Sequence, residues 1–193
     1  VLEIIFDSNS KGLNIARVHT GDPSMYGAVR EQMAALDKAG IEYEVIPGVS
    51  SVFAGAAAIK REFTLPGVTQ TLILTRMAGR TPVPESEDIE NLAKIQASMA
   101  IFLSIASIDK LVKKLMTSYP KETPAAVVYK ASWPEQKIII STLENIADKV
   151  KEANINKTAI IYVGRFLADE FELSKLYDKR FGHEFREAKD AWR

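Results

Sequence analysis

Apolar residues recur along the chain in two alternating rhythms, one typical of strands and one typical of helices, and this alternation predicts an α/β fold. Residues 2–6 resemble the end of a helix, and residues 13–19 and 41–46 resemble strands. Between these two predicted strands, apolar residues at helical spacing run from Met25 to Gly40, a typical helix terminator.

A helix of unusually small residues is predicted next. Ser50 or Ser51 is a suitable N-cap for it, and the run from Ala54 to Ala58 consists of alanine and glycine only. Such a helix can pack very close to a neighbouring sheet or to a partner subunit.

A break in the alternation marks a candidate domain boundary at residues 63–69, where Pro66-Gly67 interrupts the pattern. We therefore predict two α/β domains with mixed sheets, an N-terminal domain of residues 1–66 and a C-terminal domain of residues 67–193 that ends in a charged, aromatic tail.

The alternation resumes in the second domain. Residues 125–130 and 137–142 are separated only by a segment containing Trp133-Pro134, so these two strands should form an antiparallel pair. The other predicted strands are residues 71–76, 99–104 and 159–163, and the predicted helices are residues 86–95, 108–116 (with Ser107 as cap) and 144–153. The tail, residues 169–193, is expected to be helical or irregular.

Composition removes several classes of function. The chain has 193 residues with 25 basic and 25 acidic side chains, so no net field draws it to nucleic acid or to a membrane. It has no cysteine and only two histidines, which excludes disulfides and thiolate catalysis and predicts no metal site. No apolar run reaches the roughly 20 residues of a membrane span, and no signal peptide is visible. We expect a cytoplasmic protein.

Two loops are the candidate ligand sites because each follows a predicted strand and precedes a helix, the position where α/β sheets bind ligands. They are residues 20–24, Thr-Gly-Asp-Pro-Ser, and residues 47–51, Pro-Gly-Val-Ser-Ser. Glycine admits a close backbone approach, and Asp22 can accept hydrogen bonds from a hydroxyl or amine. The alternative is a plain turn whose aspartate caps the next helix.

Other chemistry has weaker support. The chain contains neither a Walker loop nor the Gly-x-Gly-x-x-Gly of dinucleotide binders. His19 could belong to a catalytic triad, but a histidine in an apolar strand is more often structural. Lys137, Lys175 and Arg186 are most simply surface charges. No catalytic residue is assigned.

Several segments resemble the tetrapyrrole methylase family. The resemblance rests first on Ala16-Arg17-Val18-His19-Thr20-Gly21-Asp22-Pro23-Ser24-Met25-Tyr26-Gly27 and on Ile46-Pro47-Gly48-Val49-Ser50-Ser51. Residues 70–76, 79–85 and 127–134 match in the same order. The tail, with Ser174-Lys175-Leu176-Tyr177-Asp178, His183, Phe185 and Arg186, resembles the branch that methylates precorrin-4 or cobalt-precorrin-4 at carbon 11 in cobalamin biosynthesis.

The resemblance implies a cofactor and a set of contacts. In this family S-adenosyl-L-methionine binds between the two domains and leaves as S-adenosyl-L-homocysteine. The matching positions imply cofactor contacts from Thr20, Gly21, Asp22, Met25, Ser50, Ser51, Leu103 and Ala131. The family also implies a homodimer. Its members open with a strand and a Gly-Pro-Gly-Asp-Pro loop that this sequence lacks, so we expect an incomplete first domain.

The implied reaction is methyl transfer to an electron-rich ring carbon, which needs alignment more than a strong base. The substrate carries many carboxylates, and arginine binds carboxylates bidentately. We therefore predict that Arg76 and Arg80 anchor the substrate, the alternative being solvent-facing arginines; His183 and Arg186 could serve the same end or join a dimer contact. Three other functions stay open: methylation of another corrin carbon, methylation of RNA or protein, and a non-catalytic dimerising fragment.

Overall fold

The computed structural model describes residues 1–174, 178, 180–182 and 184. Within it the chain forms two compact units, Val1–Ala54 and Gly55–Arg193. The division into domains at residues 66 and 67 stays a prediction. His183 and Arg186, together with residues 175–177 and Phe185 of the tail signature, lie outside the described residues.

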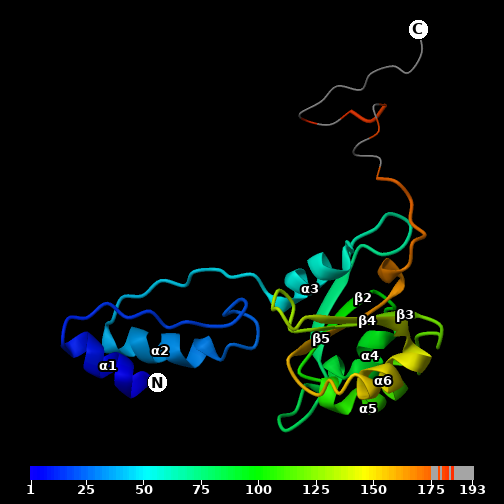
Figure 1. Cartoon of the computed structure of the whole chain (residues 1–193). Coiled ribbons are helices and arrows are strands. Elements are labelled where there is room, and N and C mark those ends of the chain that lie inside the picture. Colours follow the sequence, from blue (N-terminus) through cyan, green and yellow to red (C-terminus); the bar gives the residue numbers. More distant parts are fainter. Residues whose placement is uncertain (175–177, 179, 183, 185–193) are drawn as a thin grey trace. The chain divides into compact units, whose positions relative to one another are not determined.

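The first unit is built from two helices, α1 (Leu2–Ser10) and α2 (Val29–Ala39), connected by extended segments (Figure 1). The predicted helix at residues 2–6 is confirmed by α1. The predicted terminator is confirmed as well, because Gly40 ends α2 with a left-handed φ of 65°.

The two strands predicted in this unit are wrong. Residues 13–19 and 41–46 are extended, but neither joins a ladder, and the single described sheet lies wholly in the second unit. A strand is stabilised by a hydrogen-bonded neighbour and by burial of one face. These segments have neither, since Val18 is 79% exposed and Ile46 is 72% exposed.

The first helix turn predicted after the Gly-Asp-Pro segment is also wrong. The helix begins at Val29, not Met25, because Tyr26 (φ 57°) and Ala28 (φ 50°) have left-handed backbones that a right-handed helix cannot contain. Met25 therefore belongs to the ligand-loop region and not to the apolar stripe of α2.

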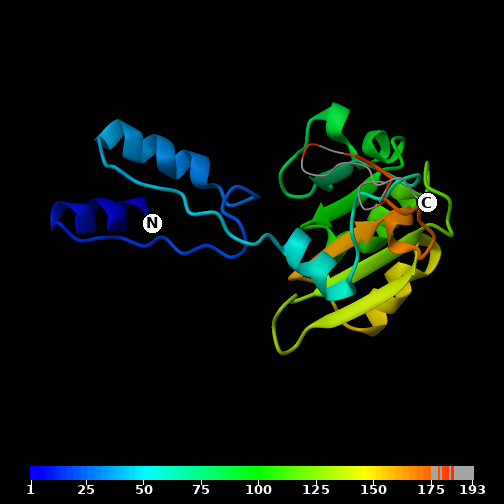
Figure 2. The same cartoon turned by 90° about the horizontal axis from the view of Figure 1, so that it is seen from above.

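The second unit is organised around a five-stranded mixed sheet (Figures 1 and 2). Its strands are β1 (Leu72–Arg76), β2 (Ser98–Phe102), β3 (Pro124–Tyr129), β4 (Lys137–Thr142) and β5 (Ala159–Val163). They lie in the order β1-β2-β5-β3-β4; β1 and β2 are parallel and the other pairs antiparallel. The predicted fold class is confirmed, and so is the antiparallel pairing of β3 with β4.

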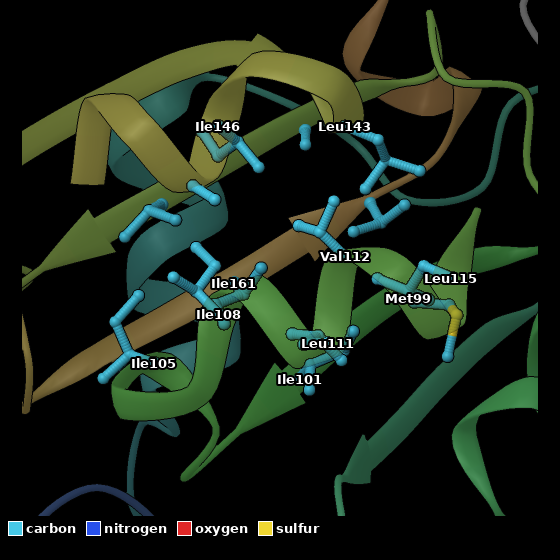
Figure 3. Packing of buried hydrophobic residues seen from close by; sticks show 14 of the residues in the cluster. Met99, Ile101, Ile105, Ile108, Leu111, Val112, Leu115, Leu143, Ile146 and Ile161 are labelled. Atoms are coloured by element: carbon cyan, nitrogen blue, oxygen red, sulfur yellow. The ribbon is translucent and has the colours of Figure 1, made fainter. Parts of the chain in front are cut away.

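Three helices cover one face of this sheet and form the main core: α4 (Ile89–Ala93), α5 (Ile108–Leu115) and α6 (Leu143–Glu152). Leu111, Leu143 and Ile161 pack together with no more than 2% exposure (Figure 3). Burying each such side chain contributes about 1.5–3 kcal/mol. This core fixes the strands whose ends carry the predicted site residues.

The helix predicted at residues 86–95 is divided in two. A short 3-10 turn, η1 (Glu85–Glu87), precedes α4, and the Asp88 side chain caps α4 by accepting from the Glu90 N–H at 3.1 Å. Two further 3-10 turns, η2 (Ile105–Ser107) and η3 (Arg165–Leu167), follow β2 and β5. Ser107 precedes α5 as predicted, although its side chain makes no cap hydrogen bond.

The opposite face of the sheet packs against α3 (Ser51–Ile59), from Gly55 onward. A Cβ placed on Gly55 would lie 2.1 Å from the Tyr162 hydroxyl, so only glycine permits this separation between helix and strand. Phe63 and Phe166 complete the contact. The centroid of the Phe63 ring lies 5.8 Å from that of Tyr162 and 5.1 Å from that of Phe166. The predicted close packing of the small-residue helix on a sheet is confirmed.

Within the described part of the chain, no helix has both the length and the apolar character needed to cross a bilayer.

Candidate ligand site

The Gly-Asp-Pro segment forms a tight turn around the Asp22 carboxylate. The Ser24 N–H donates to Asp22 Oδ1 at 2.9 Å, the Ser24 hydroxyl donates to the same oxygen, and the Met25 N–H donates to the Asp22 carbonyl at 3.2 Å. This is an Asx turn, the local structure that Asp-Pro-Ser favours. The segment is a turn, but the predicted cap is wrong: Asp22 caps no helix because α2 begins only at Val29.

The same carboxylate joins the two predicted ligand loops. The Gly48 N–H donates to Asp22 Oδ2 at 2.9 Å, across 26 positions of sequence. A Cβ on Gly48 would lie 2.1 Å from the Gly21 carbonyl oxygen, so a larger residue could not occupy this place without moving one loop. One carboxylate and two glycines therefore hold the loops against each other.

Asp22 is a carboxylate under ordinary conditions. Hydrogen bonds from the Ser24 side chain, from the Gly48 amide and from the Ser24 amide lower its pKa below the usual aspartate range. The loops are thus held together by an ionised acceptor, which forms stronger hydrogen bonds than a neutral one.

Ser50 completes the second loop as the N-cap of α3. It is buried, its hydroxyl accepts from the Val52 N–H at 3.4 Å, and its carbonyl accepts from the Phe53 and Ala54 amides at 3.0 and 3.1 Å. Of the two serines predicted as possible caps, Ser50 is the one observed. Thr20 and Ser51 are exposed beside it in the two loops.

In the second unit, four predicted site residues gather at one edge of the sheet. Arg76 pairs with Phe102 at the carboxyl ends of the parallel strands β1 and β2. Ile101 of β2 and Val127 of β3 both face Ile161 of β5, so β2 and β3 run in the same direction on either side of β5. Consequently the segments that follow β1, β2 and β3, which carry Arg80, Leu103 and Ala131, leave the sheet at the same edge.

Leu103 directly follows β2 and has an unusual conformation. Its φ is 53°, and 74% of its surface is exposed. A left-handed backbone is costly for a branched side chain and is often found at functional sites. The strand therefore ends in an apolar side chain that is turned out of the sheet.

Ala131 lies in a similarly constrained loop after β3. Its neighbours Lys130 and Ser132 have φ values of 46° and 70°. The Lys130 ammonium lies 5.0 Å from the Trp133 ring centroid and 3.4 Å from the Glu135 carboxylate. These contacts brace the loop on both sides of Ala131.

Arg76 and Arg80 differ in their surroundings. The Arg76 guanidinium donates to the Thr81 carbonyl at 3.2 Å and the Pro82 carbonyl at 2.8 Å, and so braces the loop after β1. Arg80 is exposed on that loop, next to Gly79, whose α-carbon faces open space. Substrate binding by either arginine stays a prediction.

Comparison with known proteins adds to this geometry. Residues 1–147 match the family described as Tetrapyrrole (Corrin/Porphyrin) Methylases. That is well over half of the chain. The chain belongs to the tetrapyrrole methylase family.

Similar proteins place this tetrapyrrole methylase within one branch of the family. It is 52% identical to a cobalt-precorrin-4 C(11)-methyltransferase of Methanocaldococcus jannaschii, over 97% of this chain and 73% of that protein. It is 45% identical to a precorrin-4 C(11)-methyltransferase of Pseudomonas aeruginosa, over 96% of this chain and 75% of that protein.

A solved structure agrees. The crystallised cobalt-precorrin-4 methyltransferase is 45% identical, with a TM-score of 0.84, over 86% of this chain and 70% of that one.

Two contacts in the candidate site region of this methylase involve residues that were not among the predicted site residues. The Gly48 amide is the partner of Asp22, and a Gly in a Pro-Gly loop gives only a general sign of such a role. The Ser104 hydroxyl, which bonds to the Met77 amide at 2.9 Å, follows a strand end and has no sequence signal of its own. Both contacts depend on which segments become neighbours.

Proposed function

We propose that this tetrapyrrole methylase transfers a methyl group from S-adenosyl-L-methionine to carbon 11 of cobalt-precorrin-4 during construction of the corrin ring. The observation that carries the proposal is the hydrogen bond from Gly48 to Asp22, because it joins the two loops whose sequences are the family signatures. The similarity to C(11)-methyltransferases over nearly the whole chain supports the same activity.

The two loops suit the polar half of such a donor. Thr20 and Ser51 are exposed residues with hydroxyl side chains, and Gly21 and Gly48 approach each other closely. The Asp22 carboxylate accepts three hydrogen bonds of the roughly four that two oxygens accommodate. We assign cofactor contacts here to Thr20, Gly21, Asp22, Met25, Ser50 and Ser51.

The second unit offers apolar contacts from its sheet edge. Leu103 provides an exposed apolar wall, and the small side chain of Ala131 leaves the neighbouring backbone accessible to a flat ring. We assign both to the cofactor as well.

The donor supplies a methyl group on a positively charged sulfur. As the methyl group moves, the sulfur loses its positive charge, and the charge passes to the tetrapyrrole ring until the ring loses a proton. A weakly polar wall beside the sulfur favours this spreading of charge in the transition state. The residues therefore need to align and to exclude water, and no general base is assigned among them.

The decisive experiment measures S-adenosylhomocysteine binding by calorimetry and methyl transfer from a radiolabelled donor to cobalt-precorrin-4. The Methanocaldococcus relative serves as positive control in both assays. We expect this chain to bind the product and to label the substrate. If the relative binds and this chain does not, the chain is better described as a non-catalytic unit; if it binds but labels only RNA or protein, the substrate assignment fails.

The metal state of the substrate is proposed from the identities to the named relatives. Two relatives named for the cobalt form are 52% and 46% identical, and relatives named for precorrin-4 are 42–46% identical. We therefore favour the cobalt-containing substrate. A higher kcat/KM with precorrin-4 than with cobalt-precorrin-4 would reverse this choice.

Substrate carboxylates are assigned to the loop after β1. Replacing Arg80 with alanine should raise the KM for the tetrapyrrole about tenfold with little change in kcat, because a carboxylate contact far from the reacting carbon contributes mainly to binding. Arg165→Ala, at another exposed arginine, is the control. An unchanged KM in the Arg80 variant would remove Arg80 from the site.

In this proposal Arg76 acts on substrate binding chiefly indirectly, by holding the loop that carries Arg80. The KM effects of Arg76→Ala and Arg80→Ala should then be less than additive in the double variant. Full additivity would mean that Arg76 contacts a carboxylate of its own.

The family resemblance further implies a homodimer in the cytoplasm. Sedimentation equilibrium of the purified chain tests the first point: a single species of 21.4 kDa would contradict the dimer.

A further inference from the structure

Just beyond the last paired residues of β1 and β2, a side-chain hydroxyl makes the hydrogen bond that the next pair of the ladder would have made. Arg76 and Phe102 are the final partners in the parallel ladder, and the next residues would be Met77 and Leu103. The chain instead turns at Leu103, with φ of 53°, and the ladder ends. The Met77 amide, which is buried, therefore needs another acceptor.

The Ser104 hydroxyl is that acceptor. It accepts from the Met77 N–H at 2.9 Å and donates to the Phe102 carbonyl at 2.7 Å. Ser104 is only 3% exposed, and its hydrogen bond with the Met77 amide is buried. The Ser104 hydroxyl thus bonds to residues on both sides of Leu103: to Phe102, the last residue of β2, and to Met77, the first residue after β1.

We propose that Ser104 is a positioning residue for the methyl-donor site, an inference that rests on the proposed function. Its hydroxyl holds Leu103 in the left-handed conformation that turns the side chain out of the sheet. It also ties Leu103 to Met77, where the loop carrying Arg80 begins. One buried hydroxyl thus fixes the position of Leu103, the proposed cofactor contact after β2, and of Met77, where the proposed substrate loop after β1 begins.

Another buried serine, at the first residue of β2, provides a matched control. Ser98, at the other end of β2, is fully buried, and its hydroxyl donates to the Phe63 carbonyl at 2.8 Å. Ser98→Ala and Ser104→Ala each remove one buried hydroxyl without adding volume. Both should lower the melting temperature, but only Ser104 borders the proposed site.

The test compares these two variants with the unchanged chain. In Ser104→Ala we expect the Kd for S-adenosylhomocysteine to rise about tenfold, since a buried amide loses its partner and Leu103 loses its restraint. We expect Ser98→Ala to bind like the unchanged chain. Equal Kd values in the two variants, whether both normal or both weakened, would overturn the proposal.

Hydrogen exchange supplies a readout that requires no ligand. The amides of Met77 and Leu103 should exchange about tenfold faster in Ser104→Ala than in Ser98→Ala if the hydroxyl restrains this corner of the sheet. Equal exchange would contradict the inference while leaving the proposed function intact. If the unchanged chain binds no S-adenosylhomocysteine, the proposed function fails first and the positioning role fails with it.

Discussion

The two units of this chain treat the same kind of sequence differently. Residues 13–19 and 41–46 have strand-like patterns, yet they stay unpaired, with Val18 and Ile46 largely exposed. In the second unit, strands of similar length pair with neighbours, and Val127 of β3 and Ile161 of β5, which lie in central strands, are at most 2% exposed. An alternating pattern therefore shows that a segment can form a strand. Whether it does depends on a neighbouring strand to pair with and a helix to cover one face.

The two units also hold their predicted site residues by different means. In the first, a single ionised carboxylate joins two loops. In the second, a packed sheet brings three strand ends to one edge. The first arrangement depends on a few polar contacts and the second on a core, so they should respond differently to substitution.

The largest effect is expected in the core of the second unit. Leu111→Ala removes a fully buried side chain and should reduce the free energy of unfolding by about 2–5 kcal/mol. Val18→Ala, at a position that is 79% exposed, should change it by less than about 0.5 kcal/mol. Urea denaturation measures both. A large loss at Val18 would mean that its segment is packed as a strand in solution.

A second test concerns the close contact of α3 with the sheet. Gly55→Ala should cost about 1–3 kcal/mol, because the added methyl group would meet the Tyr162 hydroxyl. Gly79→Ala is the control, since a Cβ there meets nothing within 4 Å. Adding Tyr162→Phe to Gly55→Ala should recover part of the loss. Equal thermal stability of the two glycine variants would show that α3 shifts without cost.

The third test concerns the loop contact in the first unit. Asp22→Asn places an amide donor or a neutral oxygen against the Gly48 N–H, and we expect the Kd for S-adenosylhomocysteine to rise about tenfold. Asp37→Asn is the control in the same unit, where Asp37 accepts only from the Tyr43 hydroxyl among the hydrogen bonds described for its side chain. Similar Kd values for the two variants would separate the loop contact from binding.

The loop contact should also depend on pH in one direction. Hydrogen bonds lower the pKa of Asp22, so the ionised form is favoured in the folded state. Its contribution to stability is fully present above the ordinary aspartate pKa and is lost as the pH falls through the lowered value. Acid titration, monitored by hydrogen exchange of the Gly48 amide, should show a loss of protection at low pH in the unchanged chain and not in Asp22→Asn.

Much of the fold was predictable because local pattern and packing agree in the second unit. All five strands of the sheet were placed within two residues of their observed ends, and the β3–β4 pairing followed from a connection too short for a helix. In the first unit the pattern overestimated regular structure. The left-handed residues Tyr26 and Ala28, which delay the start of α2, have no signal in the sequence.

The sequence alone determined which residue types are available for the site. The absence of cysteine, the Gly-Asp-Pro and Pro-Gly-Val-Ser-Ser loops, and the family that these segments identify are all properties of the linear chain. Tertiary structure decided what those residues contact. That Asp22 bonds to Gly48 and that Ser104 bonds to Met77 depends on segments more than 20 positions apart becoming neighbours. Hydrogen bonds act over about 3 Å in space, a distance that sequence order does not record.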